Sequence, residues 1–305
     1  ENGLLQFNKK NKLGSGRVCL HVTEEGTSIA VSRLQGAQLQ LQLCQYFSAL
    51  EIAESPDTIQ DFIEKNNLSG ANCSLVLNAS EYQLLLSEAP QVSEHEICEA
   101  LWWKVKDLVA FDIDNAQIDY LDLPEDSAKH QGRKMYAVIA DKKKVKARVD
   151  WAEFLGLTPI AVEIPETALL HLVNDLCSSV TGTSILYLDS EQSLLMLMSE
   201  GNMYLTRTLQ YNYLERMDAV VLDLQRSMDY YESQIGKPPC SKVVVLPQQE
   251  SDSAMMQTLA INMGVEISSV DINQLIDSPD AIPRDLEQHC LLVISGALRL
   301  DKKAK

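Results

Sequence analysis

The side chains that most often carry out chemistry are scattered along this sequence rather than grouped. The seven cysteines stand singly, without a Cys-x-x-Cys pair, and the five histidines show no metal-ligand spacing such as His-Glu-x-x-His. No serine or cysteine lies in the context of an activated nucleophile, such as Gly-x-Ser-x-Gly. Gly14-Ser15-Gly16 is not followed by the Gly-Lys-Ser/Thr of a phosphate loop. The sequence therefore predicts no metal site and no catalytic constellation, and we do not expect an enzyme.

Length and charge limit the classes of protein and of partner. The 305 residues are 46% hydrophobic and 23% charged, which is typical of globular proteins, and the length suggests two domains. Lys and Arg number 26 and Asp and Glu 43, which gives a formal net charge of −17. This charge repels nucleic acid and anionic lipid, so we expect a basic partner instead. Single cysteines and the lack of an apolar run of roughly 18 residues indicate a cytoplasmic protein.

The elements that would position any site follow the same order in both halves of the chain. In the first half the pattern predicts three strands, an amphipathic helix and a buried strand, at 17–23, 27–33, 38–47, 58–67 and 74–77. In the second half three strands, one long helix and a buried strand are expected at 183–189, 193–199, 203–209, 214–235 and 242–246. The chain is therefore predicted to contain two lobes of similar βββαβ organisation.

A further group of elements interrupts the first lobe, and others complete the two lobes. The capping box at 93–96 predicts the start of a helix that continues to Leu108, and strands are expected at 82–87, 116–123 and 135–140. The remaining elements are helices at 142–155, 166–177, 253–263 and 285–300 and strands at 158–164 and 265–272. We therefore divide the chain into a flexible basic N-terminal segment, a discontinuous first lobe, an insert and a second lobe, at residues 1–16, 17–78 with 147–179, 79–146 and 180–305.

Three segments of the insert carry a resemblance to a known family. They read Tyr-Gln-Leu-Leu-Leu-Ser-Glu-Ala-Pro at 82–90, Ala-Leu-Trp-Trp-Lys-Val-Lys-Asp-Leu at 100–108 and Ala-Gln-Ile-Asp-Tyr-Leu-Asp-Leu-Pro at 116–124. They resemble the inserted subdomain of MSHA-type pilus biogenesis proteins, which are similar to the type IV pilus protein PilM and to the cytoplasmic part of the type II secretion protein GspL. Residues 223–231 and 295–299 also resemble PilM-family signatures, and the resemblance covers nearly all of 17–300.

The resemblance implies the fold of the actin-like ATPase superfamily. It implies two actin-like (ribonuclease H-like) lobes of βββαβα type, a small α/β subdomain inserted in the first lobe, and a reduced covering subdomain in the second. PilM-like proteins bind the cytoplasmic tail of a bitopic, PilN-like inner-membrane protein, and GspL-like proteins recruit the secretion or assembly ATPase. We therefore expect a non-enzymatic cytoplasmic scaffold of a type IV pilus assembly platform, recruited to the inner face of the inner membrane through these partners, without nucleic acid.

In proteins of this superfamily nucleotide lies between the lobes, and three elements hold it. Where the first hairpin of the family carries Asp, this chain carries His21, with Glu24 and Glu25 after it. A carboxylate about 5 Å from one phosphate charge opposes binding by about 3 kcal/mol at an effective dielectric constant near 20. At the second hairpin Asp189 retains the metal-water position, but Glu191 replaces the glycine that permits close backbone approach.

The third element also departs from the family pattern. Pro247 stands where a Gly-Gly pair beside the adenosine is expected, and proline lacks both the amide and the conformational freedom of glycine. The comparison therefore predicts a degenerate nucleotide site and no cofactor. The alternative is an ATP-binding switch, with Mg-ATP closing the lobes, and Asp189 is the residue that supports it. Asp189 also has a simpler interpretation as a residue that caps a turn at a strand end.

Three residues are candidates for contact with a protein partner. Trp102 and Trp103 are adjacent on a predicted helix whose buried stripe includes Ile97 and Leu101, so at least one indole is expected at the edge of that stripe. The alternative for this indole is a wedge packed beneath the insert. Arg207, on a predicted strand of the second lobe, is either a partner for a carboxylate or a surface arginine.

Two longer patterns also have two interpretations each. The basic residues between 142 and 148 form either a solvated helix face or a docking site for acidic lipid or an acidic tail; they are Lys142, Lys143, Lys144, Lys146 and Arg148. The apolar seam from Leu214 to Ile235 is either the core of the second lobe or a coiled coil with a partner.

Overall fold

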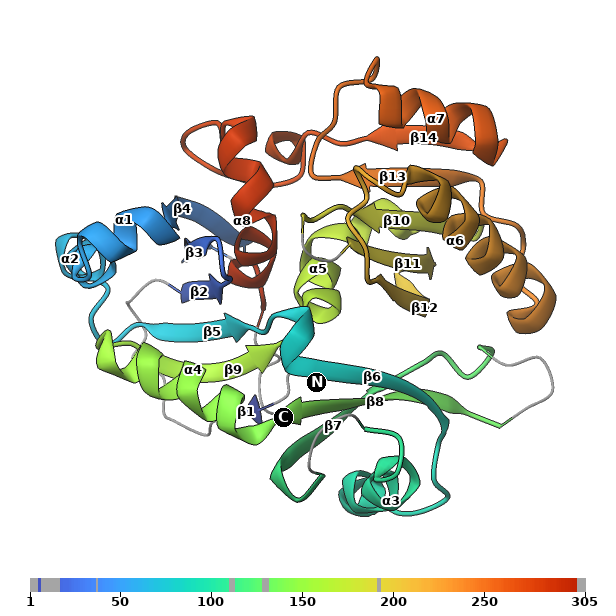
Figure 1. The fold of residues 1–305 in the computed structure, drawn as a ribbon, viewed down its shortest axis with the longest axis horizontal. Helices are drawn as coiled ribbons and strands as arrows, with labels where there is room; N and C mark the ends of the chain where they lie inside the picture. Colours follow the sequence, from blue (N-terminus) through green and yellow to red (C-terminus); the bar gives the residue numbers. More distant parts are fainter. Residues whose placement is uncertain are drawn as a thin grey trace.

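The computed structural model of the chain describes residues 5–6, 17–36, 38–109, 113–127, 132–190 and 193–300. Over these ranges the strands form three sheets, and Figure 1 shows helices packed on them and between them. Within the same ranges no helix combines the length and the apolar character that a membrane crossing requires.

The first large sheet is built from the N-terminal half of the chain. Its strands are β1 (Leu5–Gln6), β2 (Arg17–Val22), β3 (Gly26–Gln35), β4 (Gln38–Ser48), β5 (Asn72–Val76) and β9 (Thr158–Glu163). Their order in space is β1-β9-β5-β2-β3-β4. Strands β2, β3 and β4 form an antiparallel meander, whereas β5 pairs with both β2 and β9 in parallel.

The second large sheet repeats this arrangement. Its strands are β10 (Thr183–Tyr187), β11 (Ser193–Ser199), β12 (Asn202–Leu209), β13 (Lys242–Leu246) and β14 (Glu266–Ser269), in the order β12-β11-β10-β13-β14. The first sheet, read from its other edge, has the order β4-β3-β2-β5-β9, and the second has the order β12-β11-β10-β13-β14. If the strands of each sheet are numbered 1 to 5 along the chain, from β2 and from β10, both orders are 3-2-1-4-5. The predicted α/β fold class is confirmed, and the repeated order agrees with two lobes of one design.

The insert forms the small sheet, in which β6 (Tyr82–Glu88), β8 (Lys134–Asp141) and β7 (Ala116–Asp122) are antiparallel in that order. Successive residues of β8 point to opposite faces of this sheet. Met135 and Ile139 pack under helix α3 (Ile97–Val105), whereas Tyr136 and Val138 join the core of the lobes. Alternation in one buried strand thus gives the insert two apolar faces, of which α3 covers the outer one.

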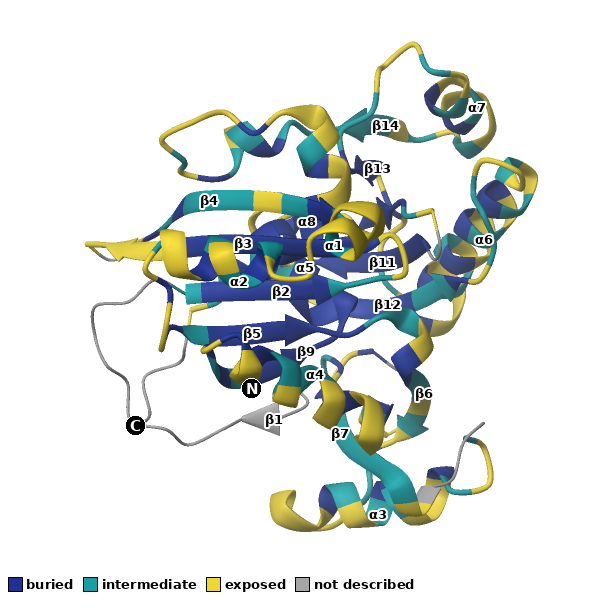
Figure 2. Cartoon of the chain, turned by 60° about the vertical axis from the view of Figure 1, so that its left-hand side comes forward, coloured by how far each residue is buried: buried dark blue, intermediate teal, exposed yellow. Residues whose placement is uncertain are grey.

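Helices cover and separate the large sheets. The other α-helices of the described ranges are α1 (Ala49–Glu54), α2 (Thr58–Lys65), α4 (Lys142–Phe154), α5 (Pro165–Val173), α6 (Met217–Tyr230), α7 (Ala254–Met263) and α8 (Arg284–Ala297). Short 3₁₀ turns occur at Ala79–Glu81, Glu94–Glu96, Ile113–Asn115, Asp175–Cys177 and Ile272–Gln274, and a π turn at Tyr231–Ile235. Figure 2 shows buried residues concentrated on the central strands of the first sheet, with exposed residues along α1 and α2.

One apolar cluster connects the two large sheets. Although α8 follows the second sheet in the sequence, it packs on β2, β3 and β4 and against α5, and Figure 1 shows both helices between the sheets. The cluster extends from Leu20 of β2 through Val293 of α8 to Met196 of β11. Gly296 permits this packing, because a Cβ atom at that position would lie 2.5 Å from the sulfur of Cys19.

Two local features at the N-terminal side do not follow from the apolar pattern. Within the segment predicted to be flexible, at 1–16, Leu5 and Gln6 pair with Val162 and Ala161 of β9, and the other residues of that segment lie outside the described residues. Helix α1 is not predicted by the apolar pattern. It begins at a capping box in which Ser48 accepts from the Glu51 amide and the Glu51 carboxylate accepts from the Ser48 amide.

The apolar seam of the second lobe is shorter than predicted. The pattern predicts a helix from Leu214, but α6 begins at Met217 and 72% of Leu214 is exposed. The side chain of Asn212 accepts a hydrogen bond from the Leu214 amide, and this local turn competes with the helix. Val221 and Ile235 are buried with the second sheet, so this seam is core where it is helical.

Candidate functional site

Two cavities of ≈200 and ≈170 Å³ lie in the crevice between the lobes. They share lining residues from both lobes: His21 and Thr23 from the β2–β3 hairpin, and Tyr187 and Asp189 from β10 and the turn after it. The resemblance predicts that His21 and Asp189 face one crevice, and the structure places both there. Their meeting results from the repeated sheet order, because β2 and β10 occupy equivalent central positions.

Two titratable side chains of the crevice, His21 and Tyr187, have pKa values shifted in the direction that favours their uncharged forms. Burial lowers the pKa of the His21 imidazole, although the nearby Asp189 carboxylate acts in the opposite direction. Burial and the same carboxylate raise the pKa of Tyr187 well above its usual range. Neither group is poised to exchange a proton near neutral pH, which general acid–base catalysis would require.

The hairpin turns use their polar groups within the protein. Thr23 Oγ1 accepts hydrogen bonds from the amides of Glu25 and Gly26, at 3.2 and 3.3 Å. Ser190 Oγ then donates to Glu25 Oε1 at 3.1 Å, which links the turns of the two lobes directly. Glu191, the other altered position of the second turn, lies outside the described residues. The amides that a phosphate would need at the first turn therefore have intramolecular acceptors.

At the end of β13 the backbone amides also have intramolecular acceptors. Pro247 is buried, and the amides of Gln248 and Gln249 donate to Glu287 Oε1 and Ser269 Oγ, both at 2.8 Å. Burial raises the pKa of Glu287, and the Gln248 amide acts in the opposite direction. Among the described residues, no group of three or more His, Cys, Asp or Glu is arranged to hold a metal ion.

A larger groove of ≈400 Å³ lies between the insert and the second lobe. Strand β6 is at the edge of the small sheet and β12 at the edge of the second large sheet, and Figure 1 shows β6 running below β12. The residues that line this β6–β12 groove come from both strands and their surroundings: Ala79, Tyr82, Gln83, Leu84, Leu85, Tyr136, Thr206, Arg207, Thr208, Leu209, Gln210 and Asp223. Its volume falls within the roughly 300–1,000 Å³ that is typical of ligand pockets.

Contacts between the insert and the second lobe join the two walls of this groove. The Tyr136 hydroxyl of β8 accepts from the Thr206 amide and donates to the Thr206 carbonyl, both at 3.2 Å. A second contact joins Asp126 to Lys237 in an ion pair and to the Tyr204 hydroxyl at 3.0 Å. Lys237 Nζ also lies 4.5 Å from the centroid of the Tyr204 ring. These contacts connect the insert to the second lobe beside the groove.

The predicted partner contacts fall in two separate places. Arg207 is half-buried and lines the β6–β12 groove. Trp102 and Trp103 lie on α3, which covers the opposite face of the insert's sheet. The basic run of α4 is partly structural, because Lys144 Nζ donates to the Ser80 carbonyl and Arg148 forms an ion pair with Glu81.

Tyr136 is a site residue that the sequence does not reveal. It stands within the apolar run of β8, where the pattern predicts a core tyrosine. Its hydroxyl meets the edge of β12, a strand 70 positions away in the sequence. Only the relative position of two sheets produces this contact, so no local signal could have identified it.

No protein-family model matches the sequence, and no curated protein matches it either. Solved structures do match. A PilM–PilN type IV pilus biogenesis complex has a TM-score of 0.73 at 14% identity, over 92% of this chain and 96% of that one. A Bacteroides thetaiotaomicron protein of unknown function, with an actin-like ATPase fold, has a TM-score of 0.56 at 9% identity, over 91% and 95%.

The cytoplasmic domain of EpsL, an inner-membrane component of the Vibrio cholerae type II secretion system, is similar as well. Its TM-score is 0.53 at 13% identity, over 93% of this chain and 95% of that domain. At identities this low, the similarity shows a shared fold and does not show a shared function. The chain therefore has the mixed α/β, actin-like fold that it shares with PilM and with the cytoplasmic domain of EpsL.

Proposed function

We propose that this protein is a non-enzymatic scaffold of a type IV pilus assembly platform of the MSHA type, with the role of MshI. In this proposal it binds the cytoplasmic tail of a PilN-like inner-membrane protein in the β6–β12 groove, and this partner holds it at the cytoplasmic face of the inner membrane. The observation that carries the proposal is a groove between two edge strands in a fold shared with a PilM–PilN complex.

The shape of the groove suits an extended chain. Edge strands present unpaired N–H and C=O groups, and an added strand satisfies them. Because Thr206 directs its amide and carbonyl toward the Tyr136 hydroxyl, alternation along β12 directs those of Thr208 to the same edge. The half-buried Leu84 lines the same groove and offers apolar surface to the side chains of the tail.

The charge of the chain favours a basic tail. The formal net charge is −17, and Asp223 lines the groove. Opposite charge accelerates association and selects among partners. Arg207 in the same groove offers a site for one carboxylate, at the tail's end or on a side chain. The best match is therefore a basic segment with apolar anchors and one acidic group.

Calorimetric titration of the isolated protein with the partner's cytoplasmic peptide tests this proposal. We expect binding with a Kd of about 1–100 µM and protection from hydrogen exchange of β6 and β12 amides on peptide binding. Strand β14 is an edge strand of the same sheet as β12, and its amides should be unaffected. Absence of binding at about 100 µM peptide, or protection elsewhere, would contradict the proposal.

A matched pair of variants localises the binding. Thr208 lines the groove, whereas Thr258 lies on α7. We expect Thr208→Arg to weaken binding of a basic tail by about tenfold or more, because the new cation repels it and fills the groove. Thr258→Arg should bind as the unmodified protein does. Equal affinities for the two variants would place the tail outside the β6–β12 groove.

We also propose that the crevice does not take up nucleotide. Support comes from the first turn, whose amides donate to Thr23, and from the carboxylate of Glu25 beside Ser190. Bound only to the native state, Mg-ATP at about 100 times its Kd would stabilise the fold by about 2.7 kcal/mol, which raises the melting temperature by several degrees. We expect no such rise at about 1 mM Mg-ATP. A rise of several degrees would instead favour the ATP-binding switch.

A second candidate partner is the assembly ATPase. The likeness to the EpsL cytoplasmic domain covers 93% of this chain, so the same fold serves a type II secretion component. Co-purification with the ATPase in the absence of the PilN-like protein would support this role, and the two roles are compatible because the groove occupies one face of the insert.

A further inference from the structure

We propose that the outer face of α3 is a docking surface for an arginine-bearing segment of a partner protein. The surface comprises Glu99, Trp103, Lys106 and Asp107, and we call it the Trp103 face. It lies on the far side of the insert's sheet from the β6–β12 groove, at the outer end of the molecule in Figure 1. The inference goes beyond the tail-binding function and does not depend on it.

The helix itself determines what this face presents. The residues of α3 that are buried under the insert's sheet are Ile97, Leu101 and Val105. At 100° per residue, Glu99 and Trp103 fall on the opposite side, four residues apart, and the exposed Asp107 follows in the turn after the helix. Trp103 is 60% exposed, so its indole is not a wedge in the core. Figure 2 shows exposed residues along α3.

The indoles already hold a cation. Lys106 Nζ lies 4.8 Å from the centroid of the Trp103 ring and 6.0 Å from that of Trp102. The two rings pack edge to face, with centroids 4.7 Å apart and planes at 83°, so Trp102 supports the orientation of Trp103. A guanidinium is planar and more weakly hydrated than an ammonium, so an arginine is a better occupant of this ring face than Lys106.

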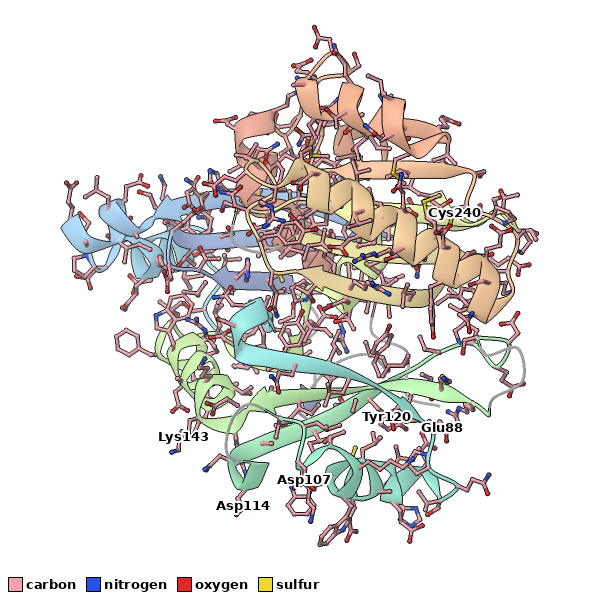
Figure 3. The ribbon with its side chains drawn as sticks, turned by 45° about the vertical axis from the view of Figure 1, so that its right-hand side comes forward. Glu88, Asp107, Asp114, Tyr120, Lys143 and Cys240 are labelled. Carbon is pink, nitrogen blue, oxygen red and sulfur yellow. The ribbon has the colours of Figure 1, made fainter. Side chains whose placement is uncertain are left out.

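The surrounding charge selects the sign of the partner. The insert, residues 79–146, contains thirteen Asp and Glu and nine Lys and Arg, a net charge of −4, and four of its nine basic residues lie on α4, away from α3. Figure 3 shows Asp107 and Glu88 on the two sides of α3 in the lower part of the view. Carboxylates next to an exposed indole accept hydrogen bonds from a guanidinium that stacks on the ring. An anionic bilayer and a second copy of this acidic insert are both repelled.

Nuclear magnetic resonance of the indole N–H groups tests the proposal, because the chain has three tryptophans. The probe is a hexa-arginine peptide added to the whole protein, with hexa-glutamate and anionic vesicles as comparisons. We expect the Trp103 signal to shift with hexa-arginine alone, while the signal of Trp151, on α4, stays in place. Trp103→Leu keeps an apolar side chain without the ring and should weaken binding by about tenfold.

Two lysine variants separate ring contact from general electrostatics. Lys106 occupies the ring face, whereas Lys104 Nζ donates to the Glu88 carbonyl at 2.9 Å. Lys104→Met and Lys106→Met remove the same charge from the same helix. We expect Lys106→Met to strengthen hexa-arginine binding about threefold more than Lys104→Met does, because it vacates the ring.

Four outcomes would overturn the inference. They are an unshifted Trp103 signal at about 1 mM hexa-arginine, undiminished binding by a folded Trp103→Leu variant, equal effects of the two lysine variants, and a Trp103 shift caused by anionic vesicles or by raising the protein concentration alone. Because the tail peptide is not used, a failure here leaves the β6–β12 groove untouched. A failure of tail binding likewise would not contradict the proposal for the Trp103 face.

Discussion

Replacing Arg299 with methionine should destabilise the protein by about 3–5 kcal/mol, the usual effect of leaving one charge of a buried ion pair unpaired. Arg299 Nη1 lies 3.0 Å from Glu163 Oε1, and the exposed fractions of the two side chains are 13% and 0%. His171 Nε2 lies 2.8 Å from the same oxygen. These contacts join β9, α5 and the end of α8, so the loss affects the centre of the first lobe.

Urea denaturation measures this effect, and two further variants control it. The pair of Arg284 with Glu250 is about half exposed, so Arg284→Met should cost about 1 kcal/mol or less. Glu163→Gln combined with Arg299→Met removes the buried charge and should recover much of the lost stability. If Arg299→Met and Arg284→Met destabilised the protein equally, the Glu163–Arg299 pair would contribute no more to stability than an exposed ion pair does.

Glu166 should make the stability of the protein depend on pH in the direction opposite to that of a paired carboxylate. Burial raises the pKa of its carboxyl from 4.5 to about 7, although the Tyr82 hydroxyl donates to it at 2.7 Å. Below pH 4.5 the group is protonated in both folded and unfolded chains and costs nothing. As the pH rises from 4.5 through 7, the folded state loses about 3 kcal/mol relative to the unfolded state.

The test compares Glu166→Gln with the unmodified protein at several pH values. The free energy of unfolding of the variant, relative to that of the unmodified protein, should rise by about 3 kcal/mol between pH 4.5 and pH 8. Glu64→Gln, on the exposed face of α2, serves as the control and should show a flat difference. A flat difference for Glu166→Gln too would mean that Glu166 ionises in the folded chain as it does in water.

The sequence by itself determined the elements and their repetition. Strand alternation and helical spacing depend on neighbours within a few positions, so the pattern located β2, β10 and the core of α3 and predicted that at least one of the Trp102 and Trp103 indoles lies at the edge of the buried stripe. Local chemistry that competes with the pattern caused the misses. The Asn212 turn makes α6 begin later than the seam predicts, and the capping box at Ser48 begins a helix with no buried residue.

The candidate sites could be predicted only in part. The resemblance predicts that His21 and Asp189 face one crevice. It does not predict that Thr23 accepts hydrogen bonds from the turn amides or that Ser190 contacts Glu25. The sequence does not locate the β6–β12 groove, although the predicted partner contact Arg207 lines it. Its walls belong to two sheets, and residues as far apart as Tyr136 and Thr206 hold them together.

Local elements can be predicted from the sequence and the sites cannot, and the reason is physical. Periodicity and capping act within one element, and the sequence records them directly. The strand edges that remain unpaired, the face on which α8 packs, and the separation of Arg207 from Trp103 depend on how elements distant in sequence bury each other's apolar surfaces. These features are determined only in the folded chain, because they depend on how the whole core packs.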